Sequence, residues 1–142
     1  MEEWIGNKYR MQTAQTQFSL STDSMVLADF ACPPNGARVC DLGCGCGALG
    51  LLLLAKNDTL HLTGIEIQPD AARCAQENAG QNGLSQLSIL QGDLRDYKTL
   101  LPANGFDVVV SNPPYYPPSS GAVCENESLA IARSELSCTL ED

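Results

Sequence analysis

Val39-Cys-Asp-Leu-Gly-Cys-Gly-Cys-Gly47 joins an apolar lead-in to three glycines at alternate positions. The lead-in is typical of a short buried strand, and the apolar run 48–55 that follows the glycines is typical of a helix. Glycine suits the turn because the backbone must visit positive φ there, and because a Cβ would keep a ligand away from the backbone. The helix N-terminus behind it offers unpaired N–H groups and partial positive charge. The segment therefore predicts a strand, a loop that binds a nucleotide-type ligand, and a helix.

Two ligands fit this loop. Gly45-Cys-Gly-Ala-Leu-Gly50 satisfies the G-x-G-x-x-G dinucleotide fingerprint, and Glu66 follows about twenty residues later, where such a fingerprint places a ribose-binding acid. The frame Asp41-x-Gly43-x-Gly45-x-Gly47 instead resembles the first motif of class I S-adenosylmethionine (SAM) methyltransferases. The resemblance implies that the acid lies beside the methionine end of the cofactor and that the glycines pass under it. A tight turn without a ligand is disfavoured, because three alternate glycines are costly.

Length and composition indicate one soluble globular domain spanning residues 1–142. We expect an N-terminal segment and helix over 1–35 and a sheet core over 36–142. The longest apolar run, 49–55, is far too short to span a bilayer, and the N-terminus lacks the features of a signal peptide. A cytoplasmic location without membrane contact is therefore expected.

Seven cysteines and a single histidine raise the question of a metal site. No C-x-x-C pair is present, and Cys44 and Cys46 occupy the variable positions of the glycine loop. Small buried thiols explain them better, and we expect no metal. The formal net charge of −9 argues against a general nucleic-acid binder, which would carry a basic face.

Apolar runs alternate with helical patterns along the chain, which indicates an α/β fold with a parallel sheet covered by helices on both faces. Ser21, Thr22 or Asp23 can cap a first helix. No element is assigned to the first twenty residues, and a polar connection is expected near residues 100–101. The expected strands are 38–42, 60–67, 87–90 and 106–110, and the expected helices are about 24–31, 48 to 56–58, and 69–82.

Polar residues fall at the C-terminal ends of the expected strands, where ligands bind in open α/β sheets. Glu66 can accept both ribose hydroxyls of either cofactor, or be a solvated strand end. Asp93, in Gly92-Asp93-Leu94, resembles the methyltransferase position that holds the adenine amino group, but it could also cap a helix. The expected SAM-binding residues are Asp41, Gly43, Gly45, Gly47, Glu66, Ile67, Asp93, Leu94 and Asn112.

Asn112-Pro113-Pro114-Tyr115 closely resembles the fourth motif of methyltransferases that modify adenine N6, guanine N2 or glutamine amide nitrogen. Such a nitrogen is a poor nucleophile because its lone pair is delocalised. An Asn oxygen and the Pro113 carbonyl can each accept one N–H, so that the lone pair turns toward the methyl donor. The prolines stiffen the loop, and Tyr115 can stack on the flat group. These four residues are the expected catalytic set.

A narrower resemblance covers nearly the whole chain. Gln17-Phe18, Ser21 and Asp23-Ser-Met-Val-Leu27, followed by the motifs above in the same order, are similar to the bacterial tRNA adenine-N6 methyltransferases that act beside the anticodon of a valine tRNA. The resemblance implies a Rossmann-like class I methyltransferase fold and a tRNA substrate. That family continues beyond this chain, so the last strands of the full fold are expected to be missing. Self-association through the exposed sheet edge is expected to follow.

The leading hypothesis is therefore SAM-dependent methylation of adenine N6 in a tRNA. The same motif would serve a glutamine-N5 methyltransferase of release factors, for which an acidic surface is no handicap, or a guanine-N2 methyltransferase of ribosomal RNA. A SAM-binding module without activity of its own is a further reading. An NAD-binding domain is disfavoured by residues 112–115.

Overall fold

The fold centres on a four-stranded parallel sheet with the strand order β5-β4-β3-β6. The computed structural model describes residues 2–14 and 20–113; Met1, 15–19 and 114–142 lie outside the described residues. The strands are β3 (Arg38–Leu42), β4 (His61–Glu66), β5 (Leu87–Gln91) and β6 (Val108–Ser111). All four were predicted, with ends shifted by one or two residues at most. The α/β prediction is confirmed.

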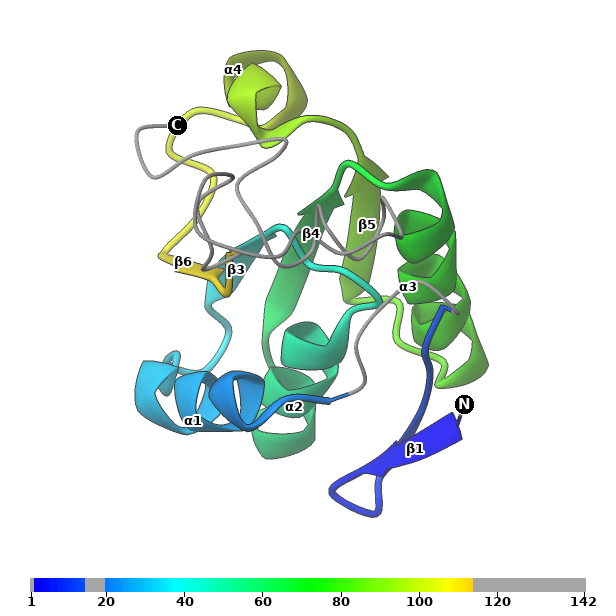
Figure 1. Cartoon of the computed structure of the whole chain (residues 1–142). Helices are drawn as coiled ribbons and strands as arrows, with labels where there is room; N and C mark the ends of the chain where they lie inside the picture. Colours follow the sequence, from blue (N-terminus) through cyan, green and yellow to red (C-terminus); the bar gives the residue numbers. More distant parts are fainter. Residues whose placement is uncertain (1, 15–19, 114–142) are drawn as a thin grey trace, which may run out of the picture.

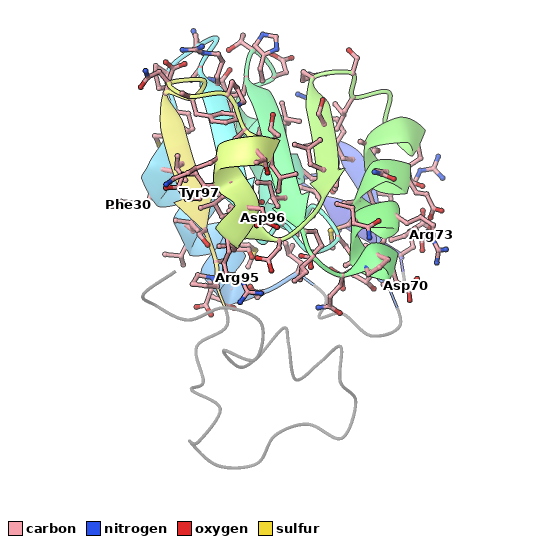
Figure 2. All side chains as sticks on the ribbon, turned by 90° about the horizontal axis from the view of Figure 1, so that it is seen from above. Phe30, Asp70, Arg73, Arg95, Asp96 and Tyr97 are labelled. Atoms are coloured by element: carbon pink, nitrogen blue, oxygen red, sulfur yellow. The ribbon has the colours of Figure 1, made fainter. Side chains whose placement is uncertain are left out.

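Helices connect the strands and cover the sheet. They are α1 (Thr22–Ala31), α2 (Ala48–Lys56) and α3 (Pro69–Gln81). A short 3₁₀ turn, η1 (Leu94–Asp96), leads into α4 (Tyr97–Leu100), where the sequence predicted only a polar connection. Figure 1 shows α1 and α2 on one side of the sheet and α4 on the other. Figure 2, seen from above, shows Asp96 of η1 and Tyr97 of α4 in front of the strands.

The core lies between the sheet and α2. Val39 pairs with Leu62 in the parallel register, and Leu62 pairs with Leu87, so these side chains share one face of the sheet. They pack with Leu49 and Leu53 of α2 in one buried cluster. Because side chains alternate along a strand, Asp41 and Glu66 point to this same face, two and four positions nearer the C-terminal ends. The core packing therefore fixes where both acids lie.

The N-terminal residues form an antiparallel hairpin that the sequence analysis did not predict. Its strands are β1 (Glu2–Ile5) and β2 (Tyr9–Gln12). Gly6 and Asn7 both adopt positive φ in the turn, as a tight reversal requires. Ile5 and Met11 are 1% and 0% exposed and belong to the main core. The hairpin is thus part of the domain's core rather than a separate appendage.

Helix α1 begins two residues earlier than expected, at Thr22. Ser21 is the N-cap, and its side chain accepts a hydrogen bond from the backbone N–H of Ser24. Ser21 was one of three predicted caps, and it fits because its hydroxyl satisfies an N–H of the first turn.

In the part of the chain that the structure describes, no helix is long and apolar enough to cross a membrane.

Strand β6 is one edge of the described sheet. Val109 on this strand is 59% exposed, and Phe30 of the neighbouring α1 is 85% exposed. Phe30 projects outward beside the sheet in Figure 2. Exposed apolar groups at a sheet edge favour association. Self-association through this edge remains a prediction, as does the division of the chain at residue 35.

Gly64 lies where β4 passes beneath the glycine loop. A Cβ at this position would lie 2.7 Å from Cys44 Sγ and 2.9 Å from Cys44 Cβ. We expect Gly64→Ala to lower the free energy of unfolding by about 1–3 kcal/mol in urea titration, because it overpacks a buried contact. Gly80→Ala is the matched control. Nothing lies within 4 Å of a Cβ there, and the helical site should gain up to about 1 kcal/mol. Equal stability of the two variants would contradict the tight contact.

Candidate functional site

The glycine loop is tied to the end of β4 by backbone hydrogen bonds. The N–H groups of Gly43 and Cys44 both donate to the Ile65 carbonyl, each at 2.9 Å. Gly43, Gly45 and Gly47 have φ of +75°, +55° and +89°. A side chain with a Cβ is strained in this region, which explains the glycine at each alternate position. The strand–turn–helix prediction is confirmed.

Glu66 holds the loop from the neighbouring strand. Its side chain is buried, with Oε2 accepting from the Gly45 N–H at 2.8 Å and Oε1 accepting from the Gln68 N–H at 2.9 Å. Glu66 is therefore not a solvated strand end. Each carboxylate oxygen can accept a further hydrogen bond. A role in binding ribose hydroxyls remains a prediction, and the structure adds that the same carboxylate shapes the loop.

Asp41 is the most unusual acid of the site. It is 3% exposed, and Oδ2 has no hydrogen-bond partner among the described residues. Burial, and then the negative charge of nearby Glu66, raise the pKa of Asp41 to about 7. An orphaned buried carboxylate oxygen is costly unless a positive charge compensates it. The unpaired Asp41 oxygen therefore suits a cationic ligand group such as the ammonium or sulfonium of SAM.

Asp93 follows β5 and caps η1. Its Oδ1 accepts from the Arg95 N–H at 2.9 Å, and the Arg95 guanidinium donates to both carboxylate oxygens. These hydrogen bonds hold the pKa of Asp93 below its ordinary value. In the described part of the chain, Asp93 thus acts as a helix cap, which is one of its two predicted roles. Binding of an adenine amino group remains a prediction. The SAM-binding roles of Ile67, which is exposed, and of Leu94, which is half-buried, also remain predictions.

Asn112 and Pro113 follow β6 directly. Ser111 pairs with Leu42, and its Oγ donates to the Leu42 carbonyl at 2.9 Å. Because Leu42 precedes Gly43, this register brings Asn112 beside the start of the glycine loop. The Asn112 Nδ2 donates to Ser24 Oγ at 3.2 Å. Pro113 is exposed, while Pro114 and Tyr115 of the expected catalytic set lie outside the described residues.

Asn78 of α3 is a site residue that the sequence analysis missed. It is fully buried, and its Nδ2 donates to the Cys46 carbonyl at 2.9 Å and to the Gln12 carbonyl at 2.8 Å. Its Oδ1 accepts from the Gln12 N–H at 2.8 Å. One amide thus joins the hairpin, α3 and the glycine loop. The available signal was a polar residue on the alanine-rich face of that helix, next to Ala79.

The cysteines around the loop are buried thiols. Cys40, Cys44, Cys46 and Cys74 are all free and buried. Burial raises the pKa of Cys40 to about 11 and that of Cys46 to about 12. The thiolate forms of Cys40 and Cys46 are therefore scarce at neutral pH, and the four thiols pack as small side chains. Within residues 2–14 and 20–113, no group of three or more His, Cys, Asp or Glu side chains could hold a metal ion.

Known proteins resemble this chain in sequence and in structure. Two curated relatives are named tRNA1(Val) (adenine(37)-N6)-methyltransferase. That of Haemophilus influenzae strain PittEE is 31% identical over 135 residues, covering 94% of this chain and 57% of the relative. That of Glaesserella parasuis serovar 5 is 32% identical over 114 residues, covering 80% and 47%. The chain thus spans about half the length of these relatives.

A solved structure supports the fold. The RNA methyltransferase from Salinibacter ruber, in complex with S-adenosyl-L-homocysteine, superposes with a TM-score of 0.56 at 23% identity, covering 66% of this chain and 60% of that one. This likeness confirms the Rossmann-like methyltransferase fold. The methyltransferase small domain family matches residues 16–136, which is most of the sequence. On these grounds, the chain belongs to the methyltransferase small domain family.

Proposed function

We propose that this chain is the cofactor-binding and amine-presenting domain of a SAM-dependent N-methyltransferase whose substrate is adenine N6 of a tRNA. The chain's family and the names of its curated relatives support this reaction and this substrate. A tRNA substrate also fits the expected cytoplasmic location.

The observation that carries the proposal is the position of Asn112. The pairing of Ser111 with Leu42 brings Asn112 beside the start of the glycine loop. An amine presented by Asn112 would thus be held next to the group bound by the loop. Alignment of two reactants in this way accounts for a large part of catalysis.

The cofactor site would be built from both sheet acids and the loop. When bound, SAM supplies an electrophilic methyl group on a positively charged sulfur. Asp41 compensates positive charge, Glu66 accepts from the ribose hydroxyls, and Asp93 receives the adenine amino group. Gly43 and Gly45 let the ligand approach the backbone, since no Cβ intervenes.

Asn112 and Pro113 would present the substrate. The Asn112 Oδ1 and the Pro113 carbonyl each accept one N–H of the amine, which draws its lone pair out of conjugation with the ring. Proline at position 113 restricts the backbone of Asn112 to extended conformations, so both acceptors keep their direction. This is stabilisation by acceptors that are in place before the reaction begins.

The substrate is tested by comparing three acceptors in the same methyl-transfer assay. We expect transfer from methyl-labelled SAM to a valine tRNA transcript, with N6-methyladenine found after digestion. Transcripts in which the anticodon-adjacent adenine is replaced by guanine serve as the matched control and should accept no label. Labelling of a release factor at glutamine, or of ribosomal RNA at guanine N2, in preference to the tRNA would replace this substrate by one of the two alternatives.

A further inference from the structure

Ser24 places a hydroxyl from the N-terminal part of the chain next to the proposed catalytic amide. It lies in the first turn of α1 and is 7% exposed. The Asn112 Nδ2 donates to Ser24 Oγ at 3.2 Å across 88 positions of sequence. A hydroxyl this deeply buried at the start of a helix has few possible partners, and here one of them is the side chain that the proposed function uses.

Ser24 itself is held by the helix cap. Its backbone N–H donates to Ser21 Oγ at 3.2 Å, and the two hydroxyl oxygens lie 3.1 Å apart. Because Asn112 donates to Ser24 Oγ, the hydrogen of the Ser24 hydroxyl can go to Ser21 Oγ. In that arrangement the three groups form a chain of hydrogen bonds that runs from Asn112 to Ser24 to Ser21.

The direction of these hydrogen bonds matters because the oxygen and nitrogen ends of a side-chain amide have almost the same shape, but the oxygen accepts hydrogen bonds and the nitrogen donates them. An amine about to be methylated can give only its N–H groups, since its lone pair faces the methyl donor. The Asn112 oxygen must therefore face the amine, and the nitrogen must face away. We propose that Ser24 is a positioning residue, whose hydroxyl takes the Nδ2 end of Asn112 and so turns Oδ1 toward the substrate amine.

This inference rests on the proposed function and deepens it. If the Asn112 amide were flipped, its Nδ2 hydrogens would face the N–H of the substrate amine, and the amine would lose one acceptor. The effect would appear in the rate of transfer, because neither the glycine loop nor the acids that hold the cofactor contact Ser24 through any described hydrogen bond. Ser24 would also give helix α1 a part in the proposed site.

The first test is kinetic. Ser24→Ala should lower kcat by about 10- to 100-fold with an unchanged dissociation constant for SAM, since a small loss of alignment costs this much. Ser24→Thr keeps the hydroxyl and should recover most of the rate. Ser21→Ala removes the helix cap. It should lower the melting temperature clearly and lower kcat only slightly. In the Asn112→Ala background, Ser24→Ala should have no further effect on kcat.

The second test needs no turnover. With ¹⁵N-labelled asparagine, the Asn112 side-chain amide can be assigned by comparison with Asn112→Ala. Its Nδ2 protons should exchange with water more slowly in the unaltered chain than in Ser24→Ala. Equal exchange in the two would overturn the contact on which the inference depends.

The outcomes separate this inference from the proposed function. If Asn112→Ala transfers methyl groups at the normal rate, the proposed function fails. If Asn112→Ala is inactive while Ser24→Ala is fully active, the proposed function stands and the positioning role of Ser24 is wrong. Additive losses in the double variant would likewise assign Ser24 a purely structural effect.

Discussion

Asn112→Ala should lower the rate of methyl transfer by about 10²–10³-fold, because it removes one of two fixed acceptors for the amine. SAM affinity should fall far less than the rate, because the contact with the amine is made in the transition state and the predicted SAM contact of Asn112 is one of several. The measurement is transfer from labelled SAM to tRNA, with SAM binding followed by calorimetry on the same preparation. Asn112 is only partly buried at the end of β6, so the melting temperature should hardly move.

Asn112→Asp is the matched control. It keeps an oxygen acceptor of the same length and loses the Nδ2 that donates to Ser24. With the Ser24 hydrogen directed to Ser21, Ser24 does not orient the carboxylate, which still offers an acceptor to the amine, so we expect a rate between those of the unaltered chain and of Asn112→Ala. Equal loss of SAM binding and of transfer in Asn112→Ala would show that the loop is structural and would remove Asn112 from the catalytic set.

The sheet and the glycine loop could be predicted because their signals are local. Each strand is a short apolar run, and Gly43, Gly45 and Gly47 occupy positions where φ is positive, which few other residues tolerate. The cap at Ser21 and the cap at Asp93 were likewise among the predicted alternatives, because each bonds a residue two or three positions away.

The hairpin could not be predicted in the same way, because distant residues hold it. Asn82 accepts from the Arg10 N–H at 2.9 Å, and Asn78 pairs with both backbone groups of Gln12. A four-residue strand gains little from its own sequence, and these contacts cross more than sixty positions. The contact between Ser24 and Asn112 is of the same kind. Sequence patterns thus predicted the strands and the positive-φ glycines, and missed the polar side chains, Asn78 and Ser24, whose hydrogen bonds join distant parts of the chain.

Asp41→Asn should make the ligand-free chain more stable relative to the unaltered chain as pH rises, and should weaken SAM binding. The pKa of Asp41 is raised from 3.8 to about 7, because burial and the Glu66 charge disfavour the carboxylate. The folded chain therefore keeps a proton that the unfolded chain has released above pH 4. This contribution to stability is complete below pH 4 and is lost as pH rises through 7.

Among the described groups with a shifted pKa, only Asp41 titrates between pH 5 and pH 8. The lowered pKa values of Asp93 and Asp107 act in the opposite sense, and only near and below pH 4. Between pH 5 and pH 8 the unaltered chain should lose about 2–3 kcal/mol of stability through Asp41, and Asp41→Asn should not. Urea titrations of both chains at the two pH values give this difference directly. It does not depend on any constant cost of burying the Asn amide.

Glu66→Gln provides a contrast on the same face of the sheet. Glu66 accepts two backbone N–H groups, so replacing its carboxylate weakens two charge-assisted hydrogen bonds and should destabilise the glycine loop. It also removes the negative charge that helps raise the pKa of Asp41, which offsets only part of this loss at pH 8, because burial is the larger cause of that shift. We therefore expect Glu66→Gln to be less stable than the unaltered chain at pH 8, whereas Asp41→Asn is expected to gain in relative stability there.

Binding of the cofactor should reverse the preference of Asp41 for its proton. A cationic group beside the carboxylate favours the charged form, so SAM should bind more tightly at pH 8 than at pH 6 and should release a proton. Calorimetry in two buffers of different ionisation enthalpy measures that proton. Asp41→Asn should weaken binding by roughly 10- to 100-fold at pH 8, the worth of a charged hydrogen bond. NADH, the control ligand, should not bind. If SAM affinity is the same at both pH values and in the variant, Asp41 does not face the cofactor, and its buried charge would need another explanation.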